Sequence, residues 1–366
     1  MFNTKARVKT LAFLLAFAAA LPAASVQTLI GTGQPGYSDT QVNNPYGMTI
    51  GPDGALYFCD LGNQVIRRLD LKTKKMTLVA GTPGKRGYTG DGGKATEATL
   101  AAPHELLFDK KGDLYIAERD NNVIRKVTMK TGIISTVAGT GKAGFSGDGG
   151  PGTMALLNQP HSIFLDRDGT MLICDILNHR IRRLHLDTGV IEAWAGTGET
   201  KATPDGAPVV GTPVTGPRTF IVSPQGDLYL SLREGNAIER IDAKTKTYRR
   251  IAGTGELGFT GDGGPALKAT FGGSAKGAAA RLAGPKGLAY GPKDSLYIAD
   301  TDSHAIRKVD LKTGVITTVL GTGEIGDGPE TDPLKCKLNR PHGVLFANGV
   351  LYVSDSEAHR IRILKP

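Results

Sequence analysis

The sequence predicts an all-β protein, a six-bladed β-propeller of four-stranded antiparallel blades that is closed by its N-terminal strand. Three observations support this fold. The 366 residues include 50 glycines, about twice the usual share, which is typical of many tight turns between short strands. One unit recurs six times along the chain. The strand that ends this unit occurs once before the first complete unit and is missing after the last one.

Residues 1–25 have the pattern of a cleavable signal peptide and are set apart from the fold. A basic start precedes an uncharged apolar run of 11 residues at 11–21, and small residues precede a cut before Val26. This run is too short to span a bilayer, which takes about 20 residues. We therefore expect residues 26–366 to form one secreted or periplasmic propeller, a monomer with no stable membrane insertion after cleavage.

The charge of the chain argues against a nucleic-acid partner. The whole sequence has 44 basic and 35 acidic residues, a net charge of +9. Removing residues 1–25, which hold three of the basic residues and no acidic one, leaves 41 against 35, a net charge of +6. This mild excess is not a nucleic-acid signature, and an exported protein has no access to RNA.

Each copy of the unit contains four runs of strand length. In the second copy these runs are 104–108, 114–117, 123–127 and 135–140, and Gly, Asp and Asn separate the first three. Short apolar runs bounded by such residues predict strands joined by hairpins. The copies are 58, 57, 57, 68 and 56 residues apart, counted from the proline that begins each one: Pro45, Pro103, Pro160, Pro217, Pro285 and Pro341.

The offset fourth strand distinguishes a ring from a long β-solenoid, the other fold that such repeats build. A solenoid would leave the last sheet short and its edge exposed. In a ring, residues 27–31 pair beside the C-terminal strand at 361–364 and complete the last blade. Closure of a six-bladed ring is therefore the simpler interpretation.

The repeat resembles the NHL-repeat family over essentially all of residues 26–366. The frame Pro-x-Gly…Asp-x-x-Gly-x-Leu-Tyr-(Ile)-Ala-Asp…Asn-x-Ile-Arg-Lys-Val is matched best at 285–309 and 103–127. Gly-Phe-(Ser/Thr)-Gly-Asp-Gly-Gly-Pro at 144–151 and 258–265 resembles the bacterial, exported branch. The resemblance implies the propeller fold but little about chemistry, because this fold carries enzymes, receptors and scaffolds alike.

A ring of candidate functional residues follows from the expected topology. If the first strand of each blade runs along the central channel, the residue after its proline lines the channel mouth. The loops that connect one blade to the next lie on the same face, and irregular connections favour it as the functional face. In order around the ring, the mouth residues are Tyr46, His104, His161, Arg218, Lys286 and His342.

Three histidines in this ring could hold a divalent metal, zinc or calcium, with a position open to water or substrate. The Pro-His segments at 160–163 and 341–344 resemble those that carry the zinc ligands of the peptidyl-hydroxyglycine amidating lyase, another NHL propeller. The resemblance implies His104, His161 and His342 as ligands.

By the same resemblance, Arg218 or Tyr46 would contact the substrate. The histidines fall unevenly, on the second, third and sixth blades, so a metal would lie off-centre or use fewer than three of them. Two alternatives stay open. In the first, Pro-His is simply a common start of such strands, and the histidine is hydrogen-bonded to water or to the backbone. In the second, Arg218 and Lys286 form an anion-binding ring.

Three other recurring features are expected to be structural. The carboxylates that end the second strands are expected to stabilise the following turn by accepting hydrogen bonds from its backbone N–H groups. The fourth blade, around 232–235, lacks such a carboxylate, and its turn should be different. The Gly-Asp-Gly-Gly loops lack the features of phosphate or calcium sites. In the basic pairs of the third strands, we expect the aliphatic parts of the side chains to be buried and the charged groups to be solvated or paired.

Two functions remain, and whether the chain is an enzyme stays open. The first is an exported binding or interaction module that presents the loop-rich face to a protein, peptide or carbohydrate, with Tyr46, Arg218 and Lys286 as binding residues. The second is a metal-dependent lyase or hydrolase. We favour the first because the histidines are uneven and no acid–base pair is evident. A sugar-lactone hydrolase would need a calcium set of Glu, Asn and Asp on the inner strands, which the sequence does not show.

Overall fold

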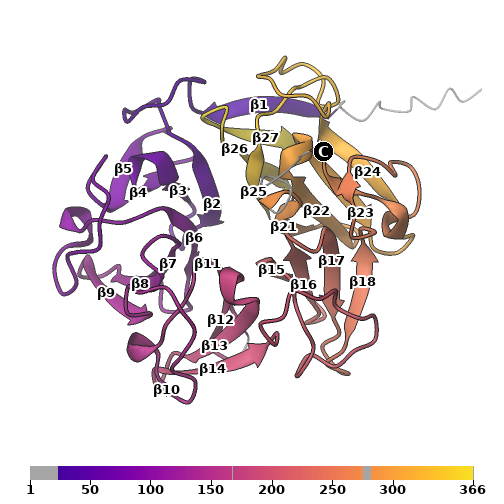
Figure 1. Ribbon diagram of the computed structural model, residues 1–366. Helices are drawn as coiled ribbons and strands as arrows, with labels where there is room; N and C mark the ends of the chain where they lie inside the picture. Colours follow the sequence, from indigo (N-terminus) through magenta and orange to yellow (C-terminus); the bar gives the residue numbers. More distant parts are fainter. Residues whose placement is uncertain (1–23, 167, 275–281, 366) are drawn as a thin grey trace, which may run out of the picture.

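In the computed structural model, which describes residues 24–166, 168–274 and 282–365, six antiparallel sheets surround a central axis as the blades of a propeller (Figure 1). The predicted six-bladed fold is confirmed. Nearly all of the expected signal peptide, residues 1–25, lies outside the described ranges. Within those ranges no helix has the length and apolar character that crossing a bilayer requires.

The strands follow the repeats, and each blade runs from an inner to an outer strand. Blades 1 to 3 comprise β2 (Pro45–Ile50), β3 (Leu56–Asp60), β4 (Val65–Leu69) and β5 (Met76–Ala80); β6 (Pro103–Phe108), β7 (Leu114–Glu118), β8 (Val123–Thr128) and β9 (Ile133–Ala138); and β11 (Pro160–Leu165), β12 (Thr170–Asp175), β13 (Arg180–His185) and β14 (Val190–Ala195).

Blades 4 to 6 comprise β15 (Pro217–Val222), β16 (Leu228–Leu232), β17 (Ala237–Ile241) and β18 (Tyr248–Ala252); β21 (Pro285–Gly291), β22 (Ser295–Asp300), β23 (Ala305–Asp310) and β24 (Ile316–Gly321); and β25 (Pro341–Ala347), β26 (Val350–Asp355), β27 (Arg360–Lys365) and β1 (Ser25–Ile30). The remaining elements are short: β10 (Gly150–Pro151), β19 (Leu257–Gly258), β20 (Phe271–Gly272), η1 (Leu61–Asn63), η2 (Ala95–Glu97), η3 (Gly152–Met154), η4 (Ile176–Asn178), η5 (Ala266–Lys268) and η7 (Thr301–Ser303).

The N-terminal strand closes the ring, as predicted. β1 pairs antiparallel with β27, with Val26 opposite Leu364 and Thr28 opposite Arg362. Figure 1 shows the indigo β1 beside the yellow β27. Val26 is fully buried in a cluster that includes Leu351 and Leu364. Both ends of the chain therefore contribute to the core of the last blade.

The hydrophobic core consists of six clusters, one between each pair of neighbouring blades. The second strand of a blade is buried on both faces, which is why it is a continuous apolar run rather than an alternating one. In β3, for example, every residue is buried. This packing holds the inner strands of adjacent blades side by side around the channel.

Buried ion pairs brace five of the six blades. In blade 3, the fully buried Arg182 lies 3.6 Å from Asp175, and its Nη2 lies 2.6 Å from Asp148 in the Gly-Asp-Gly-Gly loop. Asp175 also accepts a 2.6 Å hydrogen bond from the backbone N–H of Asn158, in the connection that enters the blade. These contacts confirm the structural role expected for the strand carboxylates, the loops and the basic residues. The arginines that occupy this position are Arg67, Arg125, Arg182, Arg307 and Arg362.

Blade 4 replaces this arrangement, and its turn between the second and third strands differs in part. Leu232 stands in place of the carboxylate, and the buried Glu239 stands in place of the arginine and pairs with Arg250 at 3.1 Å. Asn236 keeps a positive φ of 43°, close to that of its counterpart His179 at 48°. The turn of blade 4 nevertheless differs as expected in one respect: in the other five blades the N–H of this left-handed residue donates to the carbonyl oxygen three residues earlier, and among the described residues of blade 4 this bond is not made. The left-handed residue, and not the carboxylate, is what the turns share.

Candidate functional site

The six predicted mouth residues lie together in one ring at the channel mouth, each just after the proline of an inner strand. Pairing of inner and second strands shifts register directly after this proline in every blade. Such a bulge re-aims the local side chain. All six residues are buried, and Tyr46 is the most exposed of them at 8%. We call Tyr46, His104, His161, Arg218, Lys286 and His342 the mouth ring.

Aromatic contacts join four of the six residues of the mouth ring. Tyr46 stacks on His342 with ring centroids 4.1 Å apart, and its hydroxyl lies 3.0 Å from His342 Nε2. The edge of Tyr46 meets His104 at 4.6 Å, and His104 contacts His161 at 4.5 Å. Tyr46 therefore lies between His342 and the other two histidines.

Two cations complete the ring, and they are paired differently. Lys286 Nζ lies 3.0 Å from Asp302, while burial lowers the pKa of Lys286 to about 7. Arg218 donates through Nη2 to His104 Nε2 at 3.2 Å and through Nη1 to Thr219 Oγ1 at 3.3 Å. No carboxylate in the described part of the chain forms an ion pair with Arg218. Burial, followed by the charge of Arg233, lowers the pKa of Arg218 to about 10.

The three histidines of the ring are neutral. Burial holds the pKa of each well below its usual value, and the charges of Arg218 or Lys286 act in the same direction. Because Arg218 donates to His104 Nε2, the proton of this imidazole is on Nδ1. His104 Nδ1 is buried without a hydrogen-bond partner among the described residues. The mouth therefore combines a fixed positive charge with an unsatisfied polar atom.

The histidines predicted to bind a metal share one ring but do not form a ligand set. Tyr46 separates His342 from His104, and the Arg218 cation donates to the nitrogen of His104 that would face a metal. Across residues 24–166, 168–274 and 282–365, no group of three or more His, Cys, Asp or Glu side chains could hold a metal ion. This arrangement does not fit zinc or calcium, and a metal stays a prediction.

A charged rim surrounds the mouth ring on the turns between second and third strands and on the connections between blades. Three arginines pair there with carboxylates: Arg119 with Asp120 at 2.6 Å, Arg233 with Glu234 at 2.8 Å, and Arg340 with Asp302 at 3.0 Å and with Glu357 at 2.6 Å. Each of these rim arginines therefore has a carboxylate partner, whereas Arg218 in the mouth ring forms no ion pair within the described residues.

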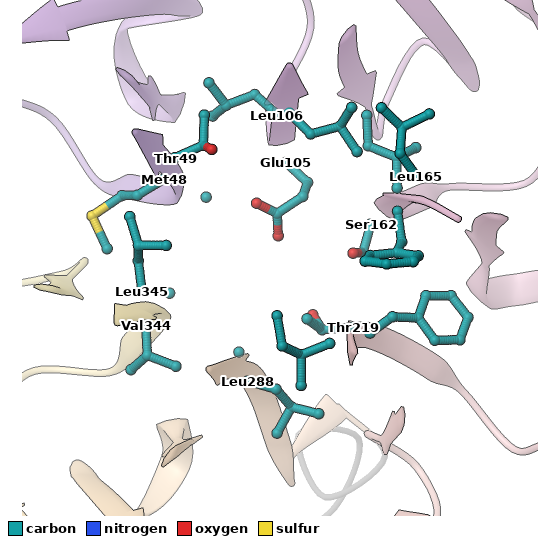
Figure 2. A pocket seen from close by; sticks show the side chains of 18 of the residues that line it. Met48, Thr49, Glu105, Leu106, Ser162, Leu165, Thr219, Leu288, Val344 and Leu345 are labelled. Atoms are coloured by element: carbon teal, nitrogen blue, oxygen red, sulfur yellow. The ribbon is translucent and has the colours of Figure 1, made fainter. Parts of the chain in front are cut away.

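Below the mouth ring, the channel contains a cavity of about 330 Å³ that the sequence analysis missed (Figure 2). Figure 2 shows the carboxylate of Glu105 extending into this space. Burial raises the pKa of Glu105 to about 7. The signal available in the sequence was a single carboxylate at a position where the other blades have only small residues: Gly47, Ser162, Thr219, Gly287 and Gly343.

Comparisons with known proteins agree with the repeat and the fold. The model of the NHL repeat matches residues 338–364, and the model of the teneurin NHL domain matches residues 73–144. The chain is 27% identical over 351 residues to NHL repeat-containing protein 2 of Bos taurus, covering 93% of this chain and 42% of that protein. It is 28% identical to Protein SUPPRESSOR OF QUENCHING 1, chloroplastic, of Arabidopsis thaliana, covering 82% and 28%. The chain thus spans less than half the length of these curated relatives.

A solved structure shows the same fold at low identity. An auxiliary nutrient binding protein from Bacteroides thetaiotaomicron superposes with a TM-score of 0.64 and 16% identity, covering 93% of this chain and 76% of that one. At this identity the likeness concerns the fold alone.

Proposed function

Because this chain is a six-bladed β-propeller of the NHL-repeat family, we propose that it is an exported binding module. Its ligand is a protein, peptide or carbohydrate that carries an anionic group. The ligand docks on the face that presents the mouth ring and the charged rim, and the signal peptide expected at residues 1–25 directs the chain to the periplasm or the medium.

The observation that carries this proposal is that the buried Arg218 makes no ion pair within the described residues. Its hydrogen bonds go to the neutral acceptors His104 and Thr219, and the carboxylate of Glu105 below the ring acts on it only through space. A buried cation is costly unless a counter-charge satisfies it directly. A carboxylate or similar group above the ring would supply that charge. Arginine presents several donors in a planar fork that matches a carboxylate.

The rim supports the same ligand chemistry. Arg119 and Arg340 are about one-third exposed, so an incoming anion reaches them before it reaches the ring. Lys286, beside Asp302, adds a second buried basic group, whose pKa of about 7 makes its charge depend on pH near neutrality. A protein with the same fold, the auxiliary nutrient binding protein, is described as a ligand-binding protein.

The test screens the purified chain on a peptide array and a glycan array whose probes span acidic, neutral and basic groups. We expect the strongest signals from acidic probes. Titration of the best probe should show about a tenfold or larger loss of affinity in the rim variant Arg119→Gln/Arg340→Gln, because two exposed cations near the ligand are removed. Arg218→Met should lose at least as much.

The matched control removes two positive charges from the opposite face. Lys72 and Lys130 lie exposed in hairpins between third and fourth strands, and Lys72→Gln/Lys130→Gln should bind as the original chain does. Preference for neutral probes, or equal losses in the rim and control variants, would overturn the proposal.

The alternative function, a metal-dependent lyase or hydrolase, requires a different arrangement of the mouth ring. His104 would have to release Arg218, and Tyr46 would have to leave the space between His104 and His342. That function stays a prediction, which the metal analysis described in the Discussion tests.

A further inference from the structure

The channel cavity is closed at the mouth ring and opens toward the opposite face. The ring residues are between 3% and 8% exposed. Three or four residues further along the inner strands, the lining side chains are only half-buried: Thr49, Phe108, Leu165, Ile221 and Leu345. The cavity is therefore separate from the ligand face proposed above.

Most of the cavity wall is apolar, and its polar groups gather on one side. Leu106, Leu288 and Val344 contribute hydrocarbon surface. Glu105, Ser162 and Thr219 come from the inner strands of three consecutive blades, β6, β11 and β15, and their side chains face the open space in Figure 2. A small number of convergent polar groups in an apolar cavity of about 300 Å³ or more is typical of small-molecule sites.

The carboxylate of Glu105 has room to act on a ligand. It lies over Gly47 of the neighbouring inner strand, where an added Cβ would stand 2.2 Å from Oε1. Within the described ranges, no side chain forms an ion pair or a hydrogen bond with this carboxylate. The positive charge of Arg218 acts on Glu105 through space, without an ion pair or hydrogen bond between them. A cation in the cavity could therefore still contact the carboxylate directly, and the hydroxyls of Ser162 and Thr219 can accept further N–H donors.

We propose that this cavity binds a small organic ammonium ion, a primary amine with an alkyl body, which enters from the face opposite the mouth ring. The ammonium donates to the Glu105 carboxylate and to the hydroxyls of Ser162 and Thr219. The alkyl body packs against Leu106, Leu288 and Val344.

The protonation of Glu105 controls this binding. Burial raises its pKa to about 7, while the charge of Arg218 above it and the backbone N–H of Leu106 act in the opposite direction. The other titratable groups that feel its charge are the buried thiols of Cys59 and Cys174, whose pKa values are raised well above normal, so both stay neutral. Only the ionised carboxylate attracts an ammonium, so affinity should fall as pH decreases through 7.

The test compares n-hexylamine, 1-hexanol and hexanoate, which share an alkyl chain and differ in charge, by calorimetric titration at pH 8 with EDTA present. We expect hexylamine to bind about tenfold or more tightly than hexanol, because a charge-assisted hydrogen bond replaces a neutral one. Hexanoate should not bind. At pH 6 the ionised fraction of Glu105 is about one-tenth of its value at pH 8, so hexylamine affinity should fall about tenfold.

Variants locate the site. Glu105→Gln should bring hexylamine down to the level of hexanol and remove the pH dependence. Leu345→Trp narrows the opening and should weaken both ligands. Glu97→Gln, at an exposed carboxylate, and the rim variant Arg119→Gln/Arg340→Gln should leave hexylamine affinity unchanged.

Thermal unfolding of Glu105→Gln should show a midpoint no lower than that of the original chain, because a buried charge is removed. Equal affinity for amine and alcohol, no binding of hexylamine, or full hexylamine affinity in Glu105→Gln would overturn the proposal. Loss of hexylamine binding in the rim variant alone would place the amine on the mouth face and would also overturn it.

Discussion

Arg218 of blade 4 donates a hydrogen bond to His104 of blade 2 across the channel mouth, with 3.2 Å between Nη2 and Nε2. This contact joins two blades that are not neighbours in the ring. It also makes Nε2 of His104 an acceptor for a permanent cation. A metal ion at this nitrogen would have to displace the guanidinium against charge repulsion.

We therefore expect the purified chain to hold zinc in less than one equivalent, and Arg218→Met to increase zinc affinity at least tenfold. The substitution removes the competing cation and frees Nε2, while the neutral His161 stays 4.5 Å away, ring to ring. Elemental analysis and competition with a zinc indicator measure both quantities. Stoichiometric zinc in the original chain that is lost in His161→Ala and in His342→Ala would contradict this expectation and favour the enzyme.

Arg182 is predicted to be essential for stability because it is the ion-pair partner of the buried Asp175. Arg182→Met leaves the fully buried Asp175 without its cation, which should lower the free energy of unfolding by about 3–5 kcal/mol. The double variant Asp175→Leu/Arg182→Met copies the apolar Leu232 of blade 4 and should recover at least half of that loss. Urea unfolding gives these values.

The control for this comparison is Arg183→Met, one residue further along β13. Arg183 is about one-quarter exposed and lies 3.7 Å from Glu192, so its loss should cost about 1 kcal/mol or less. If Arg182→Met and Arg183→Met cost the same, the buried pair does not brace the blade.

The location of the mouth ring could be predicted because it follows from the repeat. Six prolines mark six inner strands, and the next residue in each, such as His104 or Arg218, occupies an equivalent place. What these side chains contact could not be predicted where the partner is distant in sequence, as for Arg218 and His104 of another blade. The same limit hid the pairing of Asp148 with Arg182, which joins the loop before blade 3 to its third strand.

Glu105 was missed for a second reason. The register shift between Pro103 and Glu105 interrupts the alternation of side chains, so counting residues from the proline does not show which one faces the channel. Closure of the ring could nonetheless be predicted from the sequence, because the extra strand before blade 1 has no other strand to pair with than the last strand of blade 6. Repeats thus predicted the backbone and the positions, but not the contacts between blades.

His161 is predicted to make stability depend on pH. Its Nδ1–H donates to the carbonyl oxygen of Gln159 at 2.7 Å, and burial holds its pKa well below 6.5 in the folded chain. Between these two pKa values the unfolded chain binds a proton that the folded chain does not, so stability falls as pH falls below about 6.5. One such histidine contributes a slope of about 1.4 kcal/mol per pH unit.

The measurement compares the original chain with His161→Gln in urea at pH values from 8 to 5. The free energy of unfolding of the original chain should exceed that of His161→Gln by a constant amount above pH 7, and this difference should shrink as pH decreases below 6.5. Subtracting the variant removes the opposing contributions of buried carboxylates, which are common to both proteins. A difference that does not change with pH would mean that His161 titrates in the folded chain as it does in the unfolded chain, and a difference that grows as pH falls would mean that it is protonated in the folded chain. Either result would contradict the prediction.

Ring closure is predicted to depend on Val26. Its side chain is fully buried between blades 5 and 6, while the next residue, Gln27, is exposed on the same strand. In a chain that starts at Ala24, Val26→Asp should therefore lower the free energy of unfolding by about 3 kcal/mol or more, because it buries a charge without a partner. Gln27→Asp places the same charge one residue away and should change stability by about 0.5 kcal/mol or less.

A chain that starts at Thr32 extends this test to the whole strand. Without β1, the edge of β27 is unpaired and Leu364 loses its cover, so we expect a lower unfolding midpoint and self-association in size-exclusion chromatography. A synthetic peptide of residues 25–31 should restore part of the midpoint, since it can pair with β27 in the same register. If the truncated chain is as stable as the longer one, or if Val26→Asp and Gln27→Asp are equally harmless, β1 does not hold the propeller closed.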